Sequence, residues 1–172
     1  MKNITPRLDP NSIAEAIEEI RAYQKEVETK TRLLVQRLVD YGADIARVKI
    51  VGMSAVDKGD LLSGVDGYYS PTLNAGFVRV ASDHVAFVEF GTGVVGQNSP
   101  HKNGEYLSKA SWGYATGTKI FTTKNGKVGW IYPTDDGGYR FTEGMRSRPF
   151  MYETAMELAR VFDQIALGVF NT

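Results

Sequence analysis

Residues 12–42 read SIAEAIEEIRAYQKEVETKTRLLVQRLVDYG, and this stretch decides how the chain folds. Ser12 and Glu15 form the S-x-x-E pattern of a capping box, and Gly42 is a typical C-terminal cap. Between them, apolar or neutral residues recur at alternating spacings of four and three, which is typical of one face of a helix. The pattern predicts one helix of about 30 residues, whose stripe is Ile13, Ile17, Ile20, Gln24, Val27, Thr31, Leu34, Leu38 and Tyr41.

A helix of this size would be about 45 Å long, which is longer than a small domain is wide. Part of it is therefore expected to lie on another element or on another subunit. Ile20, Val27 and Leu34 are the possible interface residues on the stripe. The alternative is that both halves of the helix pack on one domain and one end stays exposed.

The chain after Gly42 predicts short strands. Alternating residues indicate a strand at 45–51 and another at 73–80, with extended chain at 65–69. The apolar run 84–90 suits a strand or a helix equally.

A long insertion is expected at about 94–142. Residues 94–117 are rich in Gly, Ser, Asn, Lys and Thr and read as an exposed loop. Asn125-Gly126 is a hairpin turn signature, so the strands around it and a third strand at 139–142 predict a small antiparallel meander.

A second helix closes the chain, with Pro149 in its first turn and a four–three apolar stripe to about Gly168. Together the elements predict a single α+β domain over residues 1–172. It has a long N-terminal helix, a mainly antiparallel β-sheet with an inserted β-meander, and a C-terminal helix packed on the sheet.

Composition excludes several classes of protein. The 20 basic and 20 acidic residues cancel, so no net charge draws the chain to nucleic acid or to an anionic membrane. There is no cysteine, which removes disulfides, thiolate metal sites and cysteine nucleophiles. The apolar runs are shorter than the roughly 20 residues of a membrane span, and no secretory signal is visible.

Motifs for catalysis or for a cofactor are weak. Residues 91–96 match G-x-G-x-x-G, but the residues that follow do not predict the long helix of a dinucleotide site. His84 and His101 lack the spacing of a metal-ligand pair, and neither is expected to matter for folding or assembly. The acidic pairs Asp57/Asp60 and Asp135/Asp136 read as turn formers, and Ser108 and Ser111 lack a nucleophile elbow. We therefore expect no enzyme, no cofactor and no metal.

Aromatic residues gather in the loop and the meander, including Trp112, Trp130, Tyr132 and Tyr139. They predict a small satellite core or a contact with a partner, and Trp112 and Trp130 join the possible interface residues. An alternative function follows, in which Trp130, Tyr132 and Tyr139 hold a sugar or a peptide.

Two segments carry a resemblance to a known family. They are AFVEFGTG at 86–93 and TEGMRSRPFM at 142–151, which leads straight into the last helix. Their order and spacing resemble the siphophage tail-component family, also called head–tail joining, neck or tail-completion proteins. The resemblance covers residues 12–170, although the stretch between the two segments is long here.

The resemblance implies a structural virion protein without catalytic residues. Glu89, Phe90, Gly91, Thr92 and Gly93 would shape the turn after a central segment of the sheet. Pro149 and Phe150 would anchor the last helix.

The implied assembly is a ring of this chain, sixfold, around the channel where DNA passes from head to tail. Its implied partners are itself and the neighbouring neck and tail-tube proteins, with DNA only as passing cargo and no membrane. The protein would be made in the bacterial host cytoplasm and would end in the virion, at the head–tail junction.

Overall fold

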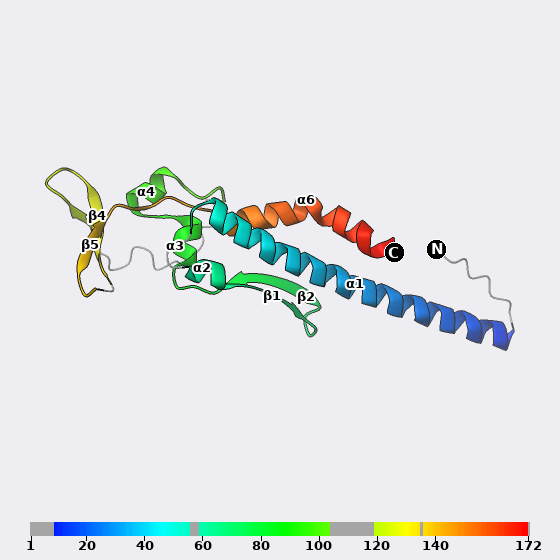
Figure 1. Cartoon of the computed structure of the whole chain (residues 1–172). Coiled ribbons are helices and arrows are strands. Elements are labelled where there is room, and N and C mark those ends of the chain that lie inside the picture. The colour runs from blue at the N-terminus through cyan, green and yellow to red at the C-terminus, as the bar shows by residue number, and fades with distance from the viewer. Residues whose placement is uncertain (1–8, 56–58, 104–118, 135, 172) are drawn as a thin grey trace.

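The computed structural model describes residues 9–55, 59–103, 119–134 and 136–171. The molecule is elongated (Figure 1). Helix α1 (Pro10–Gly52) forms its long axis, and the N-terminal half of α1 projects beyond every other labelled element. Strands β4 (Val128–Pro133) and β5 (Tyr139–Thr142) stand at the opposite end.

Helix α1 begins three residues earlier than the capping-box prediction. Asp9 is its N-cap, because the Asp9 side chain accepts a hydrogen bond from Ser12 N at 2.9 Å, and Pro10 fills the first turn. The helix has 43 residues and is about 64 Å long at 1.5 Å per residue.

The predicted strand at 45–51 is wrong, because α1 continues through Gly42 to Gly52. A Cβ at Gly42 would lie 2.9 Å from Leu158 Cδ1 and 2.9 Å from Val78 Cγ2. Gly42 therefore serves close packing inside the helix and does not end it. The short alternating segment after it also fits helical spacing, and its inward residues are buried with those before it: Val39, Ala43, Ala46 and Ile50.

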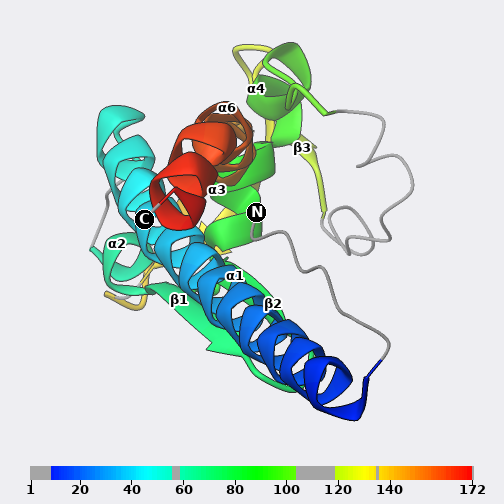
Figure 2. The ribbon, with the colours of Figure 1, turned by 90° about the vertical axis from the view of Figure 1, so that its right-hand side faces the viewer.

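Helix α1 lies between two layers (Figure 2). The antiparallel hairpin of β1 (Val65–Ser70) and β2 (Ala75–Val80) packs on one side of it. Helix α6 (Phe150–Phe170) packs on the C-terminal half of α1. The expectation that the last helix packs on the sheet therefore needs correction. The main core gathers at the C-terminal end of α1 and consists of Ala43, Ala46, Ile50, Ala55, Leu61, Val65, Val88 and Phe150.

Short elements connect these layers. Helix α2 (Asp60–Ser63) leads into β1, and the ambiguous run at 84–90 forms helix α3 (Val85–Phe90). Helix α4 (Gly93–Asn98) occupies the start of the predicted loop 94–117, whose residues from 104 onward lie outside the described part.

The strands form two small sheets where one sheet was expected. Strand β3 (Phe121–Thr122) pairs with β4, and β4 pairs with β5, both antiparallel, in the order β3-β4-β5. Strand β6 (Gly144–Met145) follows and makes isolated bridges to Thr92 and Gly93. The α+β class is confirmed, and every described strand pair is antiparallel.

Candidate functional site

The two segments at 86–93 and 142–151 lie against each other between α3 and the start of α6. Arg148 N donates to Val88 O at 2.9 Å, and Ser147 Oγ donates to Glu89 O at 2.7 Å. Met145 N donates to Thr92 Oγ1 at 3.0 Å. We call this contact region the motif junction.

Glu89 is the centre of the motif junction. Its carboxylate accepts hydrogen bonds from Met151 N at 2.9 Å and from Tyr152 N at 3.0 Å, in the first turn of α6. These N–H groups have no partner within a helix, and α6 has no side-chain cap at Pro149. A carboxylate at a helix N-terminus also interacts favourably with the helix dipole. Glu89 therefore caps α6 from another helix.

His101 completes the surroundings of this carboxylate. Its Nε2 lies 3.2 Å from Glu89 Oε1, and both side chains are buried. Because His101 Nδ1 accepts from Asn103 N at 2.9 Å, Nε2 carries the proton and donates to Glu89. The centroid of the His101 ring lies 4.9 Å from that of Phe90 and 5.5 Å from that of Tyr152.

Lys102, the residue after His101, pairs with a carboxylate of α6. Its ammonium group donates to the carboxylate of Glu153, and Lys49 Nζ of α1 lies 3.9 Å from that carboxylate. The hydrogen bond from Lys102 holds the pKa of Glu153 below its ordinary value. The pKa of Lys102 is raised by the same bond.

Glycines allow the two segments to approach each other closely. Gly91 has φ +78°, and a Cβ there would lie 2.6 Å from Ser147 N. Gly144 has φ +97°, and a Cβ there would lie 2.0 Å from Thr92 O. A side chain at either position would meet backbone atoms, so the junction needs glycine on both sides.

Pro149 and Phe150 lie at the start of α6, where Phe150 has 0% of its surface exposed. The role implied for the first segment needs correction. Glu89 and Phe90 belong to helix α3, Gly91 and Thr92 connect it to α4, and Gly93 begins α4, so the turn follows a helix and not a strand.

The predicted interface residues on α1 fall into two groups. Ile20 is 56% exposed, and Ile13 and Ile17 are each 44% exposed. Val27 is half-buried, whereas Leu34 is already buried by contacts within one chain. Helix α6 ends beside Lys30, whose Nζ lies 3.5 Å from Phe170 O. We call residues 13–29 of α1, which lie beyond this end of α6, the free half of α1.

The aromatic residues at the other end do not form one platform. Trp130 packs on the backbone of Gly93, where a Cβ would lie 2.4 Å from Trp130 Cζ3. The register pairs Tyr132 with Arg140 and Pro133 with Tyr139, so Tyr139 points to the opposite face from Trp130 and Tyr132. Trp112 lies outside the described residues.

The other candidate residues do not come together. Residues 91–96 follow a helix and open a six-residue helix, which is not the strand and long helix of a dinucleotide site. His84 is exposed, and its ring centroid lies 6.5 Å from that of Phe87, whereas His101 is buried beside Glu89. Asp136 accepts from Thr134 Oγ1 and Gly138 N, as a turn former does. Asp57, Ser108, Ser111 and Asp135 lie outside the described residues.

In the described residues, no group of three or more His, Cys, Asp or Glu side chains is placed to hold a metal ion. Within the same part of the chain, no helix is long and apolar enough to cross a membrane.

Sequence reasoning missed the contact between Glu89 and His101. The signal that could have found it is the position of Glu89 inside the apolar run AFVEF. A carboxylate among apolar residues needs polar partners, because an unpaired buried charge is strongly unfavourable.

Comparisons with protein-family models, with curated proteins and with solved structures find no significant match to this chain.

Proposed function

We propose that this chain is a non-enzymatic structural protein of a tailed bacteriophage, a subunit of the joint between head and tail. In this proposal the subunits assemble into a sixfold ring around the DNA channel and bind the neighbouring neck and tail-tube proteins. DNA passes through the ring as cargo. The protein is made in the host cytoplasm and ends in the virion.

The observation that carries the proposal is the free half of α1. It exposes Ile13, Ile17 and Ile20 along one stripe, beyond the end of α6. Most helical stability in proteins comes from packing of an apolar face rather than from helix propensity. A helix that extends past its own domain with an apolar stripe is suited to a subunit that completes its packing on assembly.

The motif junction supports the family part of the proposal. The two segments that resemble the tail-component family lie about 50 residues apart in sequence, yet they bond to each other through Glu89, Thr92 and Ser147. Their residues stabilise the fold, because they cap α6, bond the two segments to each other and pack in the core. This arrangement suits segments whose task is to hold the subunit in one shape.

The experiment is negative-stain imaging of the full chain at increasing concentration. The proposal predicts closed rings with a central opening, because heterologous contacts close when the rotation between subunits is right. Open filaments or compact globular oligomers without a central opening would contradict the ring. Monomers throughout the concentration series would contradict self-assembly.

A further inference from the structure

We infer that the free half of α1 in one subunit docks on the outer face of the β3-β4-β5 sheet of the next subunit. The inference rests on the proposed function, since it names the contact that would build the ring. Two exposed apolar surfaces at opposite ends of the molecule support this inference: one face of the sheet and the stripe of α1.

The first layer is the sheet. Side chains alternate between the faces of a strand, and paired residues share a face. The register therefore places Phe121 and Tyr139 on one face together with Ile131 and Phe141. All four side chains are exposed, and Tyr139 has 75% of its surface exposed. We call this the outer face, because Trp130 of the opposite face packs on Gly93.

The second layer is the stripe Ile13, Ile17, Ile20 on the free half of α1. A helix stripe and a sheet face each need an apolar partner, and helix on sheet is one of the common layer arrangements. The free half of α1 and the outer face lie at opposite ends of the elongated molecule (Figure 1). A subunit therefore cannot cover its own outer face with its own free half, and a second copy can.

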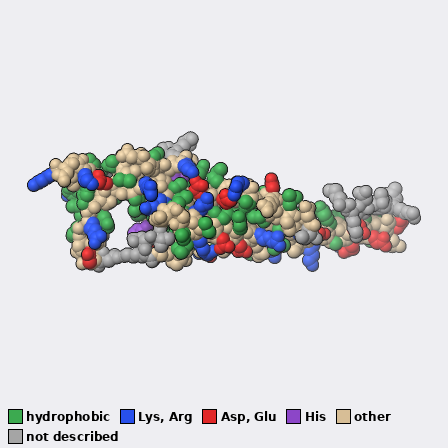
Figure 3. Space-filling model, turned by 45° about the horizontal axis from the view of Figure 1, so that its top comes forward, with side chains coloured by type: hydrophobic (Ala, Val, Ile, Leu, Met, Phe, Trp, Pro, Cys, Tyr) green, Lys and Arg blue, Asp and Glu red, His purple; other side chains and the backbone are tan. Residues whose placement is uncertain are grey.

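Charge distinguishes this pairing from the alternatives. The free half, residues 13–29, holds five Asp and Glu against two Lys and Arg, a net charge of −3. Residues 119–148 hold six Lys and Arg against three Asp and Glu, a net charge of +3. Acidic side chains gather at the projecting end of α1, and basic side chains are more frequent at the other end (Figure 3). Counting residues 1–12 as well, with Lys2, Arg7 and Asp9, still leaves residues 1–29 at −2.

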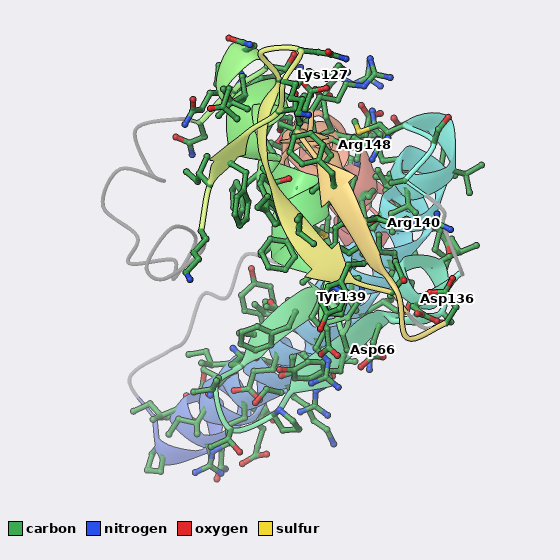
Figure 4. The ribbon with its side chains drawn as sticks, turned by 90° about the vertical axis from the view of Figure 1, so that its left-hand side faces the viewer. Asp66, Lys127, Asp136, Tyr139, Arg140 and Arg148 are labelled. Atoms are coloured by element: carbon green, nitrogen blue, oxygen red, sulfur yellow. The ribbon has the colours of Figure 1, made fainter. Side chains whose placement is uncertain are left out.

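Like ends of two copies therefore repel each other, and unlike ends attract. At 100° per residue, the side of the helix that faces away from the stripe carries Glu15, Glu18, Glu19 and Glu26. These charges steer and orient the approaching partner through long-range electrostatic attraction. The apolar contact itself is made by the stripe. On the sheet, Lys127 lies directly before β4 and Arg140 lies on β5, and Tyr139 lies near the lower end of the β4-β5 pair (Figure 4).

Disulfide trapping tests the inference, because the chain has no cysteine and each engineered pair is unambiguous. Ile20→Cys and Tyr139→Cys variants are mixed under oxidising conditions, and the covalent dimers are resolved by mass. We expect the mixed 20–139 dimer to dominate. Ala22→Cys is the matched control, because Ala22 is exposed on the helix face opposite Ile20. Its mixed dimer with Tyr139→Cys is expected to form several-fold less.

The outcomes separate this inference from the proposed function. A 20–20 dimer as the main product would mean that free halves pair with each other, which overturns the inference. Rings that still form without a 20–139 dimer would overturn the inference and leave the ring intact. If neither rings nor cross-links form with any variant, both fail. A 20–139 yield that falls several-fold between low and high salt would support the charge argument, since salt screens exposed charges.

Discussion

His101 Nε2 lies 3.2 Å from Glu89 Oε1, although the two residues are 12 positions apart in sequence. The contact joins helix α3 to the segment that follows α4. Glu89 in turn bonds the first turn of α6, so one buried carboxylate joins three parts of the chain. The two segments that resemble the tail-component family thus stabilise the fold of the chain.

Removing the carboxylate should destabilise the fold. In Glu89→Ala, the N–H groups of Met151 and Tyr152 and the ring of His101 lose their acceptor inside the protein. We expect a loss of about 2–4 kcal/mol in the free energy of unfolding. Urea denaturation followed by circular dichroism measures it. Glu143→Ala is the control, because Glu143 pairs with the exposed Lys127 and should cost less than about 1 kcal/mol. Equal stability of the two variants would refute the capping role of Glu89.

The two histidines should behave differently. His101→Ala removes a buried ring that bonds Glu89, and we expect a loss of about 1–3 kcal/mol. His84→Ala changes an exposed ring and should stay within about 0.5 kcal/mol of the wild type. This corrects the expectation that neither histidine matters for folding. The same urea experiment compares them, and a larger effect at His84 would contradict the structure.

Gly42 should not accept a large side chain. Leu158 and Val78 each have an atom only 2.9 Å from where a Cβ would lie, so Gly42→Leu would push α6 and β2 away from α1. Overpacking of this kind costs about 1–3 kcal/mol, which exceeds the gain in helix propensity of about 1 kcal/mol. Thermal unfolding measures the net effect. Gly52→Leu is the matched control, because nothing lies within 4 Å of a Cβ at Gly52.

The stripe of α1 should divide into a folding part and an assembly part. Leu34→Asp places a charge at a side chain that is only 9% exposed, and we expect a loss of more than about 3 kcal/mol. Ile20→Asp changes a side chain that is 56% exposed, so the stability of the isolated subunit should stay within about 0.5 kcal/mol. Urea denaturation at low protein concentration checks both. A large loss in Ile20→Asp would mean that the free half packs within its own subunit.

The bond between Lys102 and Glu153 should appear as a small dependence of stability on pH. Because the pKa of Glu153 is lowered in the folded protein, its contribution is present above the ordinary value of 4.5 and is lost as pH falls below it. Glu153→Gln removes this contribution at every pH. The stability difference between wild type and variant should therefore shrink as pH falls from neutrality to below 4.5. A difference that grows on acidification would contradict the bond.

The sequence predicted the elements whose signals are local. The stripe from Ile13 to Tyr41 predicted a long helix, and Asn125-Gly126 predicted the hairpin turn beside β4. The segments 65–69 and 73–80 were predicted within a few residues of β1 and β2.

The features that the sequence did not show depend on contacts between distant residues. Gly42 resembles a helix end, and only Leu158 and Val78 explain why a glycine lies inside the helix. Glu89 caps a helix that starts 61 residues later, at Phe150, so no local spacing reveals its role. The opposite orientations of Tyr139 and Trp130 follow from the register of β4 and β5, which the turn alone did not fix.

The central claim is that the exposed stripe of α1 holds subunits together. Sedimentation velocity of the wild type, Ile20→Asp and Ala22→Asp over one concentration series tests it most directly. Both variants add one negative charge to the free half, on the stripe and on the opposite face respectively. We predict assembled species for the wild type and Ala22→Asp, and monomers for Ile20→Asp at the same concentrations. Assembly of Ile20→Asp equal to that of the wild type would contradict the claim.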